Sequence, residues 1–265
     1  MNAAPWPYYD SQIAHRYWDA NPKGQKSPQA QVWSSRGCPY KCIFCVWPSS
    51  MTGNDPDGNG KRTVRHYSEQ YMEGFLSDLV ERYQYKSIYF DDDTFNLGNR
   101  HTLAMCRVMD RIRLPWTAMC RADTMHLDTW KVMKDSGCVG VKIGFESGNQ
   151  FVVDQIVNKH LDLEQAKHVV QHIKKLGMSV HGTFTYGLPG ETRGQMADTK
   201  RFIHEMGFTT YQESGCAEIE GAPLHTLTQI GHLGAYSGAS LNGFYRHADG
   251  NVKFQQLSRE LREEF

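Results

Sequence analysis

The sequence lacks any apolar run approaching the roughly 20 residues that a membrane-spanning helix needs. Its first ten residues, MNAAPWPYYD, lack the basic start and the apolar segment of a secretory signal peptide. An excess of charge of either sign is also absent, because 29 Lys and Arg residues balance 29 Asp and Glu residues. We therefore expect a cytoplasmic protein without a membrane span, and we do not expect nucleic acid as its partner.

A secreted disulfide framework is also not indicated, because the seven cysteines are odd in number and unevenly spaced. Cys38, Cys42 and Cys45 fall together in the segment SSRGCPYKCIFCVWPSS, and no fourth cysteine lies beside them. The remaining four are Cys106, Cys120, Cys138 and Cys216. Their wide spacing is typical of buried free thiols.

Strand and helix patterns alternate along residues 30–214. Strands are expected over 30–36, 86–91, 115–121, 139–145, 178–187 and 208–214, and helices over 68–83, 100–112, 127–137, 161–177 and 192–207. This alternation predicts an α/β fold with parallel strands and helical crossovers. Six strands are too few for a closed eight-stranded barrel, which leaves an open doubly wound sheet or a partial (β/α)6 barrel. In both, ligands gather at the C-terminal ends of the strands.

Three parts are expected along the chain. Residues 1–29 read as an extended lead-in, residues 30–222 as the core, and residues 223–265 as a C-terminal extension. No internal repeat or clear linker divides the core.

The clustered cysteines have three interpretations. Structural zinc requires four ligands, usually as two pairs, and His66 would have to complete an unusual set. Chance clustering of buried thiols is the second. The third is a [4Fe–4S] cluster, in which three thiolates would leave one iron without a protein ligand. The cysteines follow the first expected strand, so they belong at the end of the sheet where ligands bind.

A family resemblance favours the third interpretation. CPYKCIFC, with the spacing CxxxCxxC and Phe44 before the last cysteine, resembles the signature of the radical S-adenosylmethionine (SAM) superfamily. FDDDTFN, CRAD, IGFESGNQ and YGLPGET follow the next four strands in order. Over roughly residues 30–215 the pattern resembles the branch that includes cobalamin-dependent methylases and the oxidative cyclase of chlorophyll synthesis.

The resemblance implies two cofactors and a reaction. Three cysteines would bind three irons of a [4Fe–4S] cluster, and the amino and carboxylate groups of SAM would chelate the fourth. An electron from a low-potential donor such as flavodoxin or ferredoxin would then cleave SAM to methionine and a 5′-deoxyadenosyl radical. The hard chemistry would be the cofactor's, and the protein would supply ligation and orientation.

The resemblance also assigns SAM-binding residues. FDDDTF departs from the family's commonest second-strand motif of two glycines and a glutamate, and Asp92 or Asp93 would accept from the SAM ammonium instead. Arg121, which ends the third strand, has a guanidinium suited to a carboxylate. The ordinary alternatives are a helix-capping acidic loop for the aspartates and a surface ion pair for Arg121.

Further SAM contacts are expected from two later strands. Glu146 and Ser147 follow the apolar run VGVKIGF and would meet the ribose or the amino group. Gly187, Leu188 and Pro189 begin a turn whose backbone would approach adenine, although the same turn could simply start a helix with Thr192 as its cap. The pattern names no catalytic side chain.

The reaction outcome and the substrate are not specified by the sequence. A cobalamin-type methyltransferase is the favoured hypothesis, but no DxHxxG motif occurs. Cobalamin, if used, would therefore be held by a missing or separate domain. The aromatic residues of the lead-in, APWPYYDSQIAHRYW, would either line a substrate or cobalamin surface or pack over the sheet. A non-catalytic [4Fe–4S] electron carrier or sensor is the alternative, and it would not need the later motifs.

Overall fold

The computed structural model describes residues 1–9, 26–47, 64–225, 244–247 and 252–253. They divide into two compact units. The first contains residues 1–36, 64–143 and 169–180, and the second contains residues 37–63, 144–168 and 181–265. No helix in the described ranges is long and apolar enough to cross a membrane.

Parallel strands form the centre of the first unit. They are β1 (Gln29–Val32), β4 (Ser87–Phe90), β5 (Trp116–Cys120) and β6 (Cys138–Glu146), of which residues 138–143 belong to this unit. They pair in the order β1-β4-β5-β6. β4 consists entirely of buried residues, which is typical of a parallel strand.

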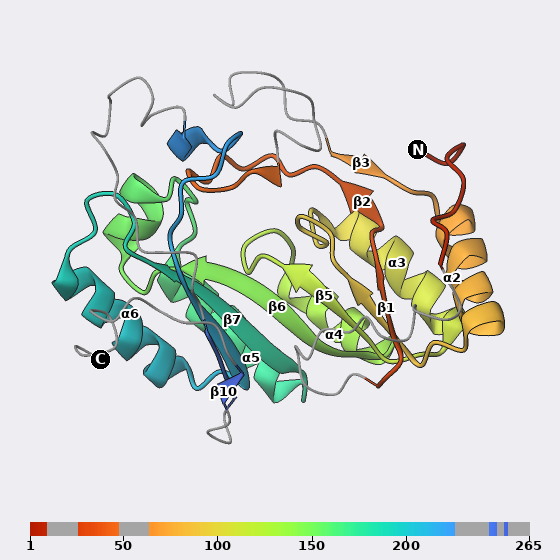
Figure 1. Cartoon of the computed structure of the whole chain (residues 1–265). Coiled ribbons are helices and arrows are strands. Elements are labelled where there is room, and N and C mark those ends of the chain that lie inside the picture. Colours follow the sequence, from red (N-terminus) through yellow and green to blue (C-terminus); the bar gives the residue numbers. More distant parts are fainter. Residues whose placement is uncertain (10–25, 48–63, 226–243, 248–251, 254–265) are drawn as a thin grey trace. The chain divides into compact units, whose positions relative to one another are not determined.

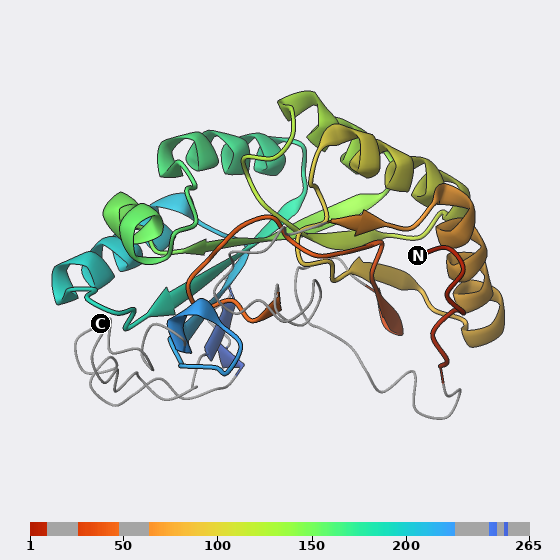
Figure 2. The same cartoon turned by 90° about the horizontal axis from the view of Figure 1, so that it is seen from above.

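Three helices of the first unit lie along one side of these strands: α2 (Glu69–Tyr83), α3 (Asn99–Ile112) and α4 (Leu127–Asp135) (Figures 1 and 2). Ser68 is the predicted N-cap of α2, and its side chain accepts from the backbone N–H of Tyr71. Beneath the helices the rings of Phe90 and Trp116 meet edge to face at 5.6 Å.

The first predicted strand, 30–36, is interrupted. β1 ends at Val32, and β2 (Ser35–Arg36) pairs in the antiparallel direction with β3 (Arg65–His66) instead. The break occurs because the backbone N–H of Ser34 donates to the carboxylate of Asp92 rather than to a neighbouring strand.

The second unit continues the alternation. It contains the end of β6, the π-helix η2 (Val152–Ile156), the start of α5 (Leu163–Lys175), most of β7 (Ser179–Tyr186), α6 (Arg193–Met206) and β8 (Thr210–Gly215). β7 and β8 are parallel. β9 (Phe244–His247) pairs antiparallel with β8, and β10 (Val252–Lys253) pairs antiparallel with β9.

Local sequence signals locate the helices of this region well. The predicted capping box of Thr192 and Gln195 starts α6. Asp162 accepts from the backbone N–H of Gln165 at 2.9 Å, and Gly177 has the positive φ of 77° expected after a helix. The π-helix was not expected.

The described part of the lead-in packs on α2. Trp6 lies 6.3 Å from the ring of Phe75, and the hydroxyl of Tyr9 donates to the carbonyl of Gln31 at 2.9 Å. Tyr9 thus contacts β1 of the sheet, as the packing alternative expects, whereas Trp6 contacts a helix instead. Residues 10–25 of the lead-in and most of the expected C-terminal extension lie outside the described residues, so both domain boundaries stay predictions.

Candidate functional site

The cysteine loop, residues 38–45, is anchored within the second unit. The N–H of Ile43 donates to the carbonyl of Val157 at 2.9 Å, and the carbonyl of Ile43 accepts from Leu224 at 2.8 Å. The amide of Asn158 donates to the carbonyl of Lys41 at 3.1 Å. Cys42, Ile43 and Phe44 pack against a buried apolar cluster that includes Val152, Val157, Leu188, Cys216 and Leu224. The predicted Phe44 therefore serves first to pin the loop.

The three predicted cluster ligands lie near one another. All three thiols are partly exposed, and the N–H of Cys45 donates to the carbonyl of Cys42 at 3.1 Å. Burial, then the neighbouring Cys42, and to a smaller extent Cys38, raise the pKa of the Cys45 thiol to about 12. Metal binding would therefore release a proton from this thiol.

These thiols fit a cluster that takes three protein ligands. In the described ranges no three His, Cys, Asp or Glu side chains already surround one metal position. The loop would thus have to draw its thiols together on binding. Three thiols on one anchored loop match the donor set of an iron–sulfur cluster better than the four-ligand set of structural zinc.

A buried ion pair borders the cysteine loop. The ammonium Nζ of Lys159 lies 2.9 Å from Oε1 of Glu146, and both side chains are about nine-tenths buried. The hydroxyl of Thr185 donates to Oε2 of the same carboxylate at 3.3 Å. The positive charge of Lys159 acts on Cys45, where it slightly lowers the thiol pKa. Glu146 has a φ of 69°, a left-handed conformation that is strained for a residue with a Cβ.

Sequence reasoning found Glu146 but missed Lys159. The two residues are separated by the π-helix, and no local pattern marks their contact. The only available signal was the need of a buried carboxylate for a partner.

The other predicted residues at the end of β6 and β7 mainly hold backbone. The hydroxyl of Ser147 is fully buried and lies 2.9 Å from the hydroxyl of Thr199. In the Gly187–Leu188–Pro189 turn, the N–H of Leu188 donates to the carboxylate of Glu191 at 3.1 Å. Burial raises the pKa of Glu191 to about 7. Glu191 was not predicted, although it belongs to the YGLPGET motif.

In the first unit, Asp92 is completely enclosed. Its Oδ1 accepts from the hydroxyl of Ser34 at 2.9 Å and also from the hydroxyl of Ser35. Burial raises the pKa of Asp92 to about 6, against the opposing effect of these hydrogen bonds. Ser34 also lies 2.9 Å from Nε2 of His101, whose pKa burial lowers to about 3. Asp93 is only half-buried, which makes it the better candidate for a ligand contact.

Arg121 is likewise engaged by the protein. Its Nε and Nη2 donate to the two carboxylate oxygens of Asp123 at 2.8 and 2.7 Å. The side chain of Asn96 bonds both the N–H and the carbonyl of Arg121. The structure thus gives the guanidinium a bidentate carboxylate partner within its own unit.

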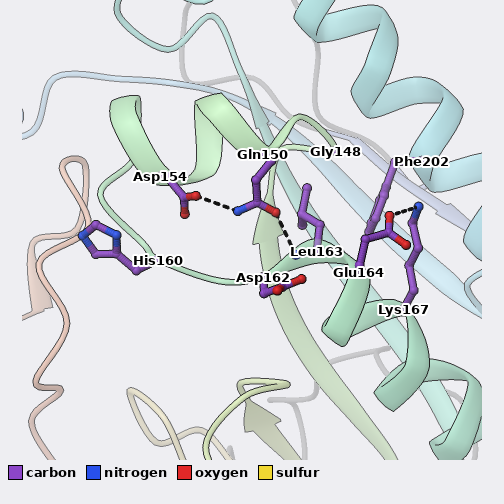
Figure 3. Close-up of a pocket in the computed structure, with 9 residues that line it drawn as sticks. All are labelled: Gly148, Gln150, Asp154, His160, Asp162, Leu163, Glu164, Lys167 and Phe202. Atoms are coloured by element: carbon purple, nitrogen blue, oxygen red, sulfur yellow. Dashed lines mark hydrogen bonds and ion pairs between the residues drawn. The ribbon is translucent and has the colours of Figure 1, made fainter.

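A pocket of about 650 Å³ in the second unit is lined by none of the predicted site residues (Figure 3). Gln150 joins its walls, because its amide donates to Asp154 at 2.8 Å and its carbonyl accepts from the N–H of Leu163 at 2.9 Å. Lys167 donates to Glu164 at 2.7 Å on the opposite wall. These polar groups are used to start α5.

Comparison with known proteins identifies the family. The model of the radical SAM superfamily matches residues 34–203. The chain belongs to this superfamily. Its six parallel strands form the half-barrel typical of it, so the predicted partial barrel is confirmed. Membership implies a [4Fe–4S] cluster and SAM as cofactors.

Several of the curated relatives are methyltransferases in name. An uncharacterized methyltransferase from Pyrococcus horikoshii is 32% identical over 208 residues, which are 78% of this chain and 42% of that protein. The cytidylyl-2-hydroxyethylphosphonate methyltransferase of Streptomyces wedmorensis is 27% identical, with 84% of this chain and 42% of that protein covered. The chain thus spans less than half the length of these two relatives.

Solved structures support the fold. The radical SAM methyltransferase TsrM from Kitasatospora setae, with cobalamin and a [4Fe–4S] cluster bound, superimposes with a TM-score of 0.66. Its sequence identity is 16%, and the match covers 80% of this chain and 42% of TsrM.

Proposed function

We propose that the chain is the core of a radical SAM methyltransferase that binds its [4Fe–4S] cluster through Cys38, Cys42 and Cys45. The observation that carries the proposal is the anchored loop with three neighbouring thiols, bordered by the buried pair of Lys159 and Glu146. The names of the two relatives above support the assignment to methyl transfer.

A reduced cluster bound by the three cysteines would supply the electron for reductive cleavage of SAM. The chain's own residues would hold the two cofactors and orient them. The backbone bonds of Ile43 fix the cysteine loop. We propose that the Glu146 carboxylate, held by Lys159 and Thr185, accepts hydrogen bonds from the ammonium or ribose of SAM. Asp93 is proposed as the acceptor in the first unit in place of the enclosed Asp92.

We also propose that the protein uses cobalamin in methyl transfer. Support comes from the relatives, since TsrM was solved with cobalamin bound and TokK of Streptomyces tokunonensis is named as a cobalamin-dependent methyltransferase. The chain contains no DxHxxG motif, so other residues would hold the cobalamin. A low-potential electron donor is the expected partner.

Anaerobic reconstitution with iron and sulfide, followed by reduction in the presence of SAM, tests the core of this proposal. Wild-type protein and the Cys216→Ala variant should release 5′-deoxyadenosine, whereas Cys42→Ala should not. Cys216 is the matched control, because it is a buried thiol near the same loop. A cluster-loaded wild-type protein that releases none would contradict the proposed function.

A further inference from the structure

One face of β7 and β8 is uniformly polar. The register of the two parallel strands places three pairs of polar residues side by side: His181 with Thr210, Thr183 with Gln212, and Thr185 with Ser214. Because side chains alternate between the faces of a strand, all six share one face. The contact of His181 Nδ1 with the Thr210 hydroxyl at 2.7 Å agrees with this assignment. We call these six residues the polar face.

The opposite face of the same strands is a packed core. Phe184 stacks with Phe145 at 5.7 Å and meets Phe208 at 5.6 Å, and α6 contributes Phe202 to this cluster. This aromatic cluster helps hold α6 against the strands. The same face also carries the buried carboxylate of Glu213, which accepts from the hydroxyl of Tyr186 at 2.9 Å.

Four members of the polar face retain contact with solvent. Thr183, Thr185, Gln212 and Ser214 are half-buried, whereas His181 and Thr210 are fully buried. The amide of Gln212 donates to the hydroxyl of Ser214 at 3.0 Å. Hydroxyl and amide groups both donate and accept, so a partner that does the same would match them.

The polar face continues into the candidate SAM site. Thr185 donates to Glu146, and an added side chain at Gly144 would lie 2.5 Å from the Glu146 carboxylate, 3.1 Å from the Lys159 ammonium and 3.4 Å from the Thr183 hydroxyl. The absence of a side chain at Gly144 thus lets these three groups approach its backbone and one another, which joins Thr183 of the polar face to the Glu146–Lys159 pair. Since Lys159 neutralises Glu146, the region carries no net charge from this pair, which disfavours an anionic ligand.

From this juxtaposition we propose that the polar face binds the substrate of the SAM chemistry, and that the bound part is a neutral, hydroxyl-rich group of the sugar or nucleoside class. The inference rests on the proposed function and adds a substrate class to it. A site built to hydrogen-bond hydroxyl groups discriminates strongly against analogues that lack them, because its own polar groups would be left unpaired. A flat apolar ring would leave several polar groups of this face without a hydrogen-bond partner.

The hydroxyl groups that match the polar face could come from the substrate or from the ribose of SAM, so the test is performed on cluster-loaded protein saturated with SAM and without reductant. The hydroxylated probes are cytidine, uridine, D-glucose and myo-inositol, and the apolar probes are indole and quinoline. Binding is followed by saturation-transfer NMR. The double variant Thr183→Val/Gln212→Leu removes two polar groups of the face, and Tyr211→Phe removes one hydroxyl from the opposite face as the control.

We expect at least one hydroxylated probe to bind, and the double variant to weaken it about tenfold or more, as the loss of one or two hydrogen bonds implies. Tyr211→Phe should leave binding unchanged. If the double variant does not fold, the smaller change Ser214→Ala takes its place, and it should also weaken probe binding.

The proposal is overturned if none of the four hydroxylated probes binds, if the apolar probes bind more tightly, or if the variants reduce SAM affinity instead of probe binding. The last result would assign the polar face to the ribose of SAM. Release of 5′-deoxyadenosine by the same wild-type preparation is measured in parallel. Release without probe binding overturns only the substrate class, whereas no release contradicts the proposed function itself.

Discussion

The charged side chains at the strand ends of the first unit differ from those of the second in what they contact. In the first unit, Asp92 is saturated by serine donors and Arg121 by Asp123. In the second unit, Glu146 and Lys159 pair beside a thiol loop and a half-exposed polar face. Motif residues at equivalent strand ends therefore differ: some are satisfied by the protein's own groups, and for others we propose contact with a ligand.

The largest expected effect concerns the cysteines of the second unit. Changing Cys38, Cys42 or Cys45 to Ala should abolish the reconstituted cluster of about four irons and four sulfides. Cys106, Cys120 and Cys138, all buried thiols of the first unit, should be individually dispensable. Iron and sulfide analysis with absorbance spectra measures both. A triple variant lacking Cys38, Cys42 and Cys45 that still holds the cluster would refute the assignment.

Breaking the buried ion pair should have the next largest effect. Lys159→Met leaves the Glu146 carboxylate buried without its cation, which typically costs about 3–5 kcal/mol in the free energy of unfolding. Adding Glu146→Gln should recover part of this loss. Lys131→Met is the control, since its pair with Asp135 is exposed and should contribute at most about 1 kcal/mol. Chemical denaturation measures these free energies of unfolding. Equal losses in both lysine variants would show that the buried pair contributes no more to stability than the exposed one.

Arg121→Lys tests whether Arg121 stabilises the first unit or contacts SAM. The substitution retains charge but loses the bidentate contact with Asp123, so it should lower the free energy of unfolding by about 1–3 kcal/mol. Arg107→Lys, at an exposed pair with Glu69, should have almost no effect. If Arg121 is structural, SAM affinity measured by equilibrium dialysis should change less than twofold. A loss of SAM affinity of about tenfold would indicate that Arg121 contacts SAM, and the two units would then not differ in this respect.

The smallest effect is the pH dependence of Asp92. Because burial raises its pKa to about 6, the folded state binds this proton more tightly than the unfolded state does. The contribution of Asp92 to stability is therefore greatest at low pH, and it decreases as the pH rises from about 4 to about 6. Asp92→Asn should reduce the change in the free energy of unfolding across this pH window by about 1–2 kcal/mol. It should also disturb the serine contacts at every pH. Thermal melts at several pH values provide the measurement, and an unchanged slope would contradict the burial argument.

The fold could be predicted largely because its signals are local. Ser68, Thr192 and Gln195 mark helix starts, and Gly177 marks a helix end, within a few residues of the elements that they limit. The break between β1 and β2 could not be predicted, because it depends on a contact between Ser34 and Asp92, which are 58 residues apart.

The candidate site was predictable in its residue types but not in their roles. The spacing of Cys38, Cys42 and Cys45 is a local pattern, and so is the position of Glu146 after an apolar strand. The bond of Glu146 to Lys159 and that of Arg121 to Asp123 depend on how side chains are placed by the tertiary structure. Spacing along a sequence shows that a charged group ends a strand, but it does not show whether the protein already satisfies that group.

Electron paramagnetic resonance of the reduced, cluster-loaded protein, recorded with and without SAM, tests the central claim most directly. If three cysteines leave one iron open to SAM, addition of SAM should change the g values of the reduced cluster in the wild-type protein and in Cys216→Ala. A spectrum that SAM does not alter would contradict the claim and would identify the chain as an electron carrier or sensor.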